Sequence, residues 1–151
     1  MKQMSARVVS LQLHTAHGVL PTPVREVTAD VGAGIAGDSH GGRPNRAVLV
    51  IDSSTHDALG LRPGDLREQI TIRGLPDVTG LAEGTELRIG GVTLRVNGEC
   101  EPCTHIGEMN GQPDVEAFRV SLVGRRGALC TVVTAEAPIR VGDTVTVLVR
   151  A

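Results

Sequence analysis

Hydrophobic and polar residues alternate along much of this chain, a pattern typical of β-strands with one buried face. The alternation predicts strands over residues 6–14, around Val24–Val27, and at Ile70 and Ile72. The run RAVLVID at 46–52 is compact and aliphatic, which indicates a buried strand. Short strands therefore dominate the expected fold.

The clearest local signal is a hairpin in residues 81–99. Apolar residues alternate with polar ones on both sides of Gly90-Gly91. Two glycines readily adopt the positive φ angles that a two-residue hairpin turn requires. The aliphatic runs at 127–134 and 143–150 predict two further strands, with a connecting loop between them.

Two short helices are predicted. Residues 53–60 begin with serines that can cap a helix and end at Gly60, a residue type common just after a helix. Residues 113–124 carry Asp114 as a candidate cap, followed by apolar residues at helical spacing. The segment THIGEMNG at 104–111 contains two glycines and other poor helix formers, so no helix is expected there.

Composition agrees with strands joined by tight turns. The 151 residues fit one domain of common size, and 19 glycines and 8 prolines indicate many turns. The only aromatic residue is Phe118, which we expect in an otherwise aliphatic core. We therefore expect a mainly β protein with one domain over 1–151, folded as a single closed or nearly closed β-barrel with two or so short helices.

Charge and hydropathy argue against two classes of partner. With 15 basic and 17 acidic residues the net charge is −2, and no basic face indicates binding to nucleic acid. No apolar run approaches the ~20 residues that span a bilayer, and the first residues lack the apolar region of a signal peptide. We expect a cytoplasmic protein without membrane contact. Its three cysteines are then expected as thiols, ligands or catalysts rather than structural disulfides.

Two of these cysteines, Cys100 and Cys103, lie in the segment CEPCTH, which ends with His105. One interpretation is a zinc site, because Cys-x2-Cys is half of a zinc knuckle and His105 is a third ligand; His40 could be a fourth. A second is a reversible disulfide, although thioredoxin-like chemistry requires a helix start in a βαβ unit. A third is a nucleophilic or metal-binding thiolate on Cys103, which His105 stabilises or serves as proton carrier. The simplest alternative is two ordinary thiols in a turn, and Cys130, in an apolar run, is expected in the core.

A glycine-rich segment at 32–46 is a candidate loop around a ligand. Five glycines in fifteen residues allow the backbone to approach a bound group closely. One interpretation is a cradle for an anion, with two arginines as charged clamps. The alternative is a turn-rich connection with solvated arginines. The candidate ligand-binding residues are Asp38, His40, Gly41, Arg43 and Arg46.

Two further pairs of residues are candidates. Glu68 and Gln69 precede a predicted strand, where they form either a solvated edge or a pocket mouth. At a pocket mouth, a carboxylate and an amide would offer acceptor and donor groups to a ligand. Of Arg125 and Arg126, at least one is expected to be exposed, and either could meet a phosphate. Three other histidines are given no role: His14, His17 and His56.

Four segments, in chain order, resemble the MOSC domain: GDSHGGRPNRAVLVID, LRPGDLREQITIRGLPDVTGLAEGTELRIGGVTLRV, CEPC and LVGRRGALCTVVTAEAPIRVGDTVTV. This domain is found at the C-terminus of molybdenum cofactor sulfurases and as stand-alone bacterial proteins. The resemblance extends from about Gly37 to Val147. It implies that the whole chain is one stand-alone MOSC domain with a β-rich, barrel-like fold.

The resemblance also implies functional positions. The family's cysteine, which handles sulfur or binds molybdenum cofactor, maps to Cys103. Its Gly-Asp-x-His motif maps to Gly37, Asp38 and His40. The EQITI stretch maps to Glu68 and Gln69, and many relatives have Asn where this chain has glutamine. A second cysteine at position 100 is less general in the family, which keeps the metal-site interpretation open.

The leading hypothesis is a sulfur-carrier or molybdenum-cofactor-handling domain. Cys103 would carry a persulfide or ligate the metal, while His105 or His40 adjusts its protonation. As an enzyme it would be a small transferase or lyase acting on a carbon–sulfur or metal–sulfur bond. The expected partners are a small-molecule ligand and either a cysteine desulfurase or a molybdoenzyme. The alternative is a small zinc-binding β-barrel with Cys100, Cys103 and His105 as ligands.

Overall fold

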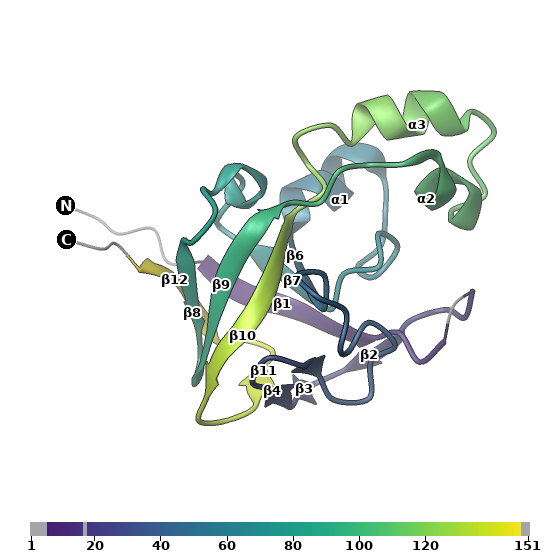
Figure 1. The fold of residues 1–151 in the computed structure, drawn as a ribbon. Coiled ribbons are helices and arrows are strands. Elements are labelled where there is room, and N and C mark those ends of the chain that lie inside the picture. Colours follow the sequence, from purple (N-terminus) through teal and green to yellow (C-terminus); the bar gives the residue numbers. More distant parts are fainter. Residues whose placement is uncertain (1–5, 17, 149–151) are drawn as a thin grey trace.

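In the computed structural model, which describes residues 6–16 and 18–148, the chain forms a closed β-barrel flanked by short helices (Figure 1). Seven strands form the ring, in the order β12-β8-β9-β10-β6-β7-β1, and β1 pairs back with β12. Their bounds are β1 (Ala6–Leu13), β6 (Val48–Asp52), β7 (Ile70–Arg73), β8 (Glu86–Ile89), β9 (Val92–Glu99), β10 (Ala128–Ala135) and β12 (Thr144–Leu148). The predicted mainly β barrel is confirmed.

Closure of the ring depends on β1, because its two halves pair with different strands. At its start, Ala6 pairs with Val145 of β12, which joins the two ends of the sheet. Further along, Leu11 pairs with Val24 of an additional strand, β2 (Thr22–Val24). Neighbouring strands of the ring are antiparallel except β6 and β7, which run parallel.

Four two-residue strands form two small sheets beside the barrel. β3 (Glu26–Val27) pairs with β11 (Ile139–Arg140), and β4 (Ala29–Asp30) pairs with β5 (Gly34–Ile35). The strand predicted around Val24–Val27 is therefore interrupted and belongs to two sheets. The connection predicted between the last two ring strands contains β11.

Apolar side chains form two cores on opposite sides of the sheet. The larger core fills the barrel, and the smaller one lies between the outer face of β6 and β10 and the helices. Val48 and Val50 of β6 belong to the first core, and Leu49 and Ile51 to the second. This two-sided burial explains the unbroken aliphatic run of that strand. Phe118 lies in the second core, as expected.

The predicted helices at 53–60 and 113–124 are confirmed as α1 (Ser53–Leu59) and α3 (Val115–Ser121). Gly60 ends α1 in the left-handed conformation, and Asp114 caps α3 by accepting a hydrogen bond from a backbone N–H. The cap of α1 is Asp52, whose carboxylate accepts from a backbone N–H, and neither serine takes that role. A short 3-10 helix, η1 (Val78–Gly80), lies between β7 and β8.

The prediction of no helix at 104–111 was wrong, because the chain forms α2 (Thr104–Met109) there. Ile106 of α2 is 1% exposed and anchors the helix in the second core. A Cβ on Gly107 would lie 3.1 Å from the Val115 Cα, so this glycine allows α2 and α3 to pack closely. Tertiary packing thus outweighs weak helix propensity. No helix in the described part of the chain is long and apolar enough to cross a membrane.

Candidate functional site

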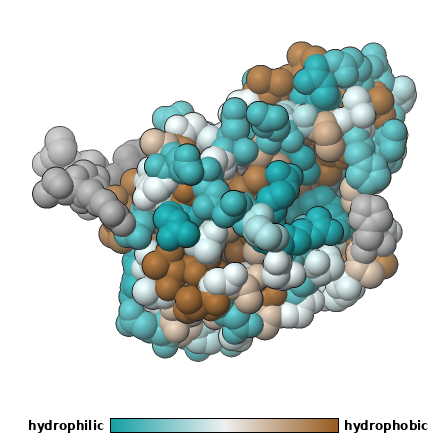
Figure 2. All heavy atoms as spheres, viewed as in Figure 1, coloured by the Kyte–Doolittle hydropathy of each residue, from teal (hydrophilic) through white to brown (hydrophobic). Residues whose placement is uncertain are grey.

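An open pocket of about 200 Å³ lies between α2 and the adjoining end of the barrel. Figure 2 shows hydrophilic side chains gathered in the region between the helices and the barrel. The pocket unites segments that are distant in the sequence and brings together most of the predicted site residues: His40, Arg43, Arg46, Gln69, Cys100, Cys103 and His105. It also contains residues without a predicted role, Leu49, Arg67, Ile106, Met109 and Leu129, together with Arg126, one of the two arginines considered as phosphate ligands.

The three cysteines are free thiols in different surroundings. Cys103 is exposed and directly precedes α2. Cys100 is 3% exposed, and burial raises the pKa of its thiol although Arg126 and Arg46 partly oppose the shift. Cys130 is fully buried, which raises its pKa to about 12 and confirms the expected core position. A ligand in the pocket therefore meets Cys103 as its accessible thiol.

The zinc interpretation is not supported by this geometry. Among residues 6–16 and 18–148, no three histidine, cysteine, aspartate or glutamate side chains gather closely enough to hold a metal ion. Cys100 packs into the second core, whereas Cys103 and His105 are exposed. The imidazole of His105 instead lies 3.3 Å from the carboxylate of Glu108, one turn along α2.

Four arginines make the pocket strongly cationic. Arg43 and Arg46 are exposed, Arg67 is half-buried, and Arg126 is 8% exposed. Burial lowers the pKa of Arg67, Asp38 raises it, and the charges of Arg43 and Arg126 lower it further. Such repulsion between neighbouring guanidinium groups favours binding of an anion among them.

His40 and Asp38 form a hydrogen-bonded pair at the pocket wall. The carboxylate of Asp38 lies 2.9 Å from His40 Nδ1 and also accepts from the backbone N–H of His14 and from the Gln69 amide. Burial alone would raise the pKa of Asp38, but these hydrogen bonds lower it to about 2. The ionised carboxylate holds the proton on Nδ1, which leaves Nε2 of His40 as the nitrogen able to accept a proton.

Gln69 and Gly41 support the glycine-rich loop. The Gln69 carbonyl oxygen accepts from the Leu49 N–H at 2.7 Å, and its amide donates to Asp38. Gly41 is exposed and does not line the pocket; its N–H donates to the Asp38 carbonyl at 3.1 Å, and a Cβ there would approach that oxygen to 3.2 Å. Both residues therefore act on the position of Asp38 and, through it, on His40.

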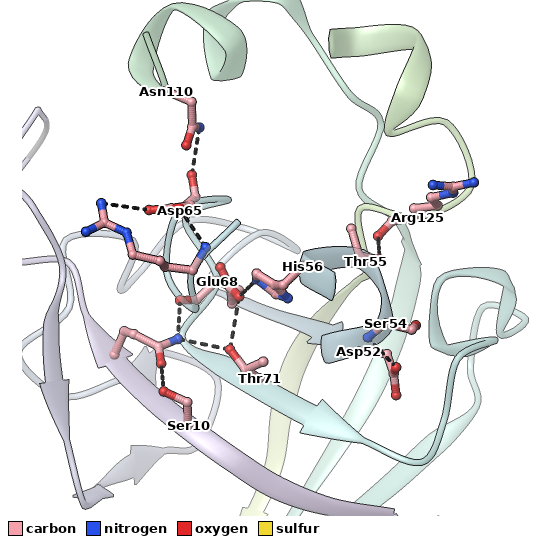
Figure 3. Close-up of polar contacts among 12 residues, drawn as sticks. Ser10, Asp52, Ser54, Thr55, His56, Asp65, Glu68, Thr71, Asn110 and Arg125 are labelled. Carbon is pink, nitrogen blue, oxygen red and sulfur yellow. Dashed lines mark hydrogen bonds and ion pairs between the residues drawn. The ribbon is translucent and has the colours of Figure 1, made fainter. Parts of the chain in front are cut away.

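Glu68 lies in the protein interior, so both expectations for it, a solvated edge and a pocket mouth, were wrong. Its carboxylate is fully buried, 2.5 Å from His56 Nε2, and accepts from the Thr71 hydroxyl (Figure 3). Burial lowers the pKa of His56, but the hydrogen bond and charge of Glu68 outweigh it and raise the pKa. This buried pair fixes the start of β7 behind the pocket.

Two histidines that were given no role therefore belong to the buried polar structure around the site. His14 is fully buried, donates from Nε2 to the Glu68 carbonyl, and stands edge-on to the His40 ring at 5.6 Å. Burial lowers the pKa of His14 and favours its neutral form. No local pattern marks His14 or His56, because their partners come from other segments. His17 lies outside the described residues.

Comparison with known proteins shows related sequences and folds. The family model described as the MOSC domain matches residues 37–146. The YuaD protein from Bacillus subtilis is 24% identical, with a TM-score of 0.79 over 95% of this chain and 96% of that chain. YiiM from Geobacillus stearothermophilus is 17% identical, with a TM-score of 0.73 over 96% of this chain and 76% of that chain. YiiM from Escherichia coli is 18% identical, with a TM-score of 0.68 over 99% and 72%. In a search of curated proteins, none matched significantly.

Proposed function

Since the chain belongs to the MOSC domain family, we propose that its arginine-lined pocket binds the molybdenum cofactor and that Cys103 is the thiolate ligand of the metal. The cofactor combines a soft metal centre with a pterin that carries a phosphate. An accessible thiol beside a group of guanidiniums matches both chemical features.

One observation carries the proposal. Arg126 is 8% exposed, and its Nε has no hydrogen-bond partner among residues 6–16 and 18–148. Its Nη1 contributes one long hydrogen bond, 3.4 Å from the Glu101 carbonyl. A buried guanidinium with so few partners is unfavourable unless an anion pairs with it. Because Arg126 lines the same pocket as Cys103, an anionic ligand would lie close to the sulfur.

Each residue then has a distinct task. Arg126 and Arg67 would bind the phosphate or another anionic edge from the buried side, and Arg43 and Arg46 would contact it from the exposed loop. His40, whose Nδ1 pairs with Asp38, would contact the ligand from the pocket wall. When bound, the cofactor supplies a redox-active metal that exchanges oxygen or sulfur atoms with a substrate.

A sulfur-carrier function uses the same thiol. The Cys103 thiolate would attack the outer sulfur of a persulfide on a cysteine desulfurase, the donor's S–S bond would break, and the donor would leave as a thiolate. A carrier of this kind requires an accessible cysteine but no cluster of four arginines. The pocket lining therefore favours cofactor binding, and transfer to or from a molybdoenzyme partner would be a second use of the site.

The test is metal and pterin content after expression in a host that makes the cofactor. We expect about one molybdenum and one pterin per wild-type chain. Cys103→Ser should lose the metal, and Arg126→Gln should lose both. The matched control is Cys130→Ala, which removes a cysteine outside the pocket and should retain both.

Native mass spectrometry separates the two uses of the thiol. A wild-type chain one sulfur atom heavier, reversed by reductant and absent in Cys103→Ser, would indicate the carrier function. Wild-type protein without molybdenum or pterin, or a Cys103→Ser variant with wild-type molybdenum, would overturn the cofactor proposal.

A further inference from the structure

A second hollow, of about 150 Å³, adjoins the arginine-lined pocket and shares Arg67 and Met109 with it. Its other walls come from the loop at 18–21, the turn at 64–65 and the residue that follows α2. None of these residues is needed to hold an anion or to present the Cys103 thiol.

The walls of the second hollow are joined by direct contacts. Gly64 has a positive φ of 92°, and a Cβ there would lie 2.7 Å from a side-chain carbon of Pro21, so the turn packs directly on the loop. The Asn110 amide donates to the carbonyls of Asp65 (2.9 Å) and Ile106 (2.8 Å), which ties α2 to the same turn (Figure 3). The hollow is therefore preformed rather than a gap between mobile segments.

Arg67 stands between the two cavities. Its backbone has a φ of 68°, in the left-handed region that non-glycine residues rarely adopt. Strained backbone of this kind is concentrated at functional sites, where it aims a side chain. Here the guanidinium lines both the pocket of Cys103 and the second hollow.

The polar groups of the second hollow select a particular chemistry. Both amide hydrogens of Asn110 are used, so its remaining polar atom is a carbonyl acceptor. Asp65 adds a carboxylate that is 17% exposed, accepts from the Arg62 backbone N–H at 2.8 Å and lies 3.7 Å from the Arg62 guanidinium. Arg67 offers only donors. An anionic ligand would be repelled by Asp65, because the paired Arg62 side chain is 80% exposed and its charge is screened by solvent; a cationic ligand would be repelled by Arg67. A neutral group with an acceptor beside an N–H donor can pair with both sides.

The remaining surface is apolar. Val19 is 49% exposed and Leu20 76% exposed, and they line the hollow together with Pro21 and Met109. These side chains can cover the hydrocarbon body of a small ligand.

We propose that the second hollow binds the organic substrate of this site, an uncharged small molecule with an apolar body and an amide-like edge. The idea that this molecule is a substrate rests on the proposed function, because the reactive group would sit in the neighbouring pocket. The binding chemistry itself rests on the residues of the second hollow alone.

Benzamide is the probe, with benzoate and benzylamine as charged comparators of the same size. In ¹H–¹⁵N spectra of the labelled chain, benzamide should shift the backbone amides of Leu20, Asp65 and Asn110. The comparators should bind at least about fivefold more weakly. Inorganic phosphate, titrated separately, should shift the amides near Arg43 and Arg126 instead.

Leu20→Asp should weaken benzamide binding by about fivefold or more and leave phosphate affinity unchanged. Val31→Asp is the matched control, since Val31 is 64% exposed and outside both cavities. Benzamide shifts confined to the arginine-lined pocket, equal binding of a charged comparator, or equal effects of the two aspartate variants would each overturn the proposal. A chain that lacks molybdenum yet binds benzamide as described would refute the proposed cofactor function but support the proposed binding site in the second hollow.

Discussion

The left-handed backbone of Arg67 allows its effect on folding to be separated from its effect on binding. We predict that Arg67→Gly is more stable than Arg67→Ala. Both variants remove the guanidinium, its contact with the pocket and its repulsion by Arg43 and Arg126. The comparison therefore isolates the backbone at a φ of 68°.

The magnitude follows from two opposing effects. The left-handed conformation disfavours an L-residue by about 1–2 kcal/mol, which alanine retains and glycine avoids. Glycine lowers the stability of the folded chain by about 0.5–1 kcal/mol, because it has greater conformational freedom in the unfolded chain. From the central values of these ranges, the net preference for glycine is about 0.75 kcal/mol, which for a chain of this length corresponds to about 1.5–3 °C in melting temperature.

Urea unfolding curves, followed by circular dichroism, measure this difference if the two variants share the same slope. Phosphate titrations on the same samples should show an equal loss of affinity in both. An alanine variant as stable as the glycine variant would mean that position 67 is not held in the left-handed region, and the argument for an aimed side chain would fail.

Four other predictions follow from the described contacts. The pKa of Asp38 is lowered from 3.8 to about 2, so the wild type should lose about 2 kcal/mol of stability as pH falls through that range. Urea titrations should show no such loss in Asp38→Asn. The raised pKa of His56 stabilises the folded chain below pH 6.5, and this stability is lost as pH rises through the raised pKa. The free energy of unfolding of His56→Gln should therefore vary less with pH than that of the wild type. Identical pH profiles would contradict the pairing of His56 with Glu68. Gly127→Ala should lose at least about 2 kcal/mol, measured by urea unfolding, because φ is 88° and a Cβ would overlap the Val50 carbonyl oxygen; a neutral effect would refute the close approach. Iodoacetamide should add one group to the native chain, mapped to Cys103 by mass spectrometry, and prior labelling of a buried thiol would contradict the assigned exposure.

Most strands of the ring could be predicted from apolar residues at every second position. The strand β6, which is buried on both faces, could be predicted from its unbroken aliphatic run. The helix at 104–111 could not, because its glycine serves a contact with α3 that is absent from the local pattern. The cap of α1 was misplaced by one residue for a related reason. Asp52 ends a buried strand, and its carboxylate also accepts from the Leu75 N–H, a partner that only the folded sheet brings near.

Much of the site could be predicted from short motifs, and the structure brings Cys103 and His40 to one pocket. Glu68 was misplaced because the left-handed turn at Arg67 breaks the alternation, so that neighbouring residues 68 and 69 are both buried. Arg67 carries no motif of its own. The direction of its side chain depends on that turn. A positive φ angle at one isolated residue leaves no trace in the periodicity of the sequence.

The pairing of Ala6 with Val145 has a consequence for biosynthesis. Among the described strands, β1 leaves the ribosome first and β12 last, so the ring stays open until β12 has emerged. A nascent chain at that stage presents unpaired strand edges, which favour aggregation and proteolysis. We therefore expect any group loaded into the cysteine pocket to arrive after β12 has left the ribosome.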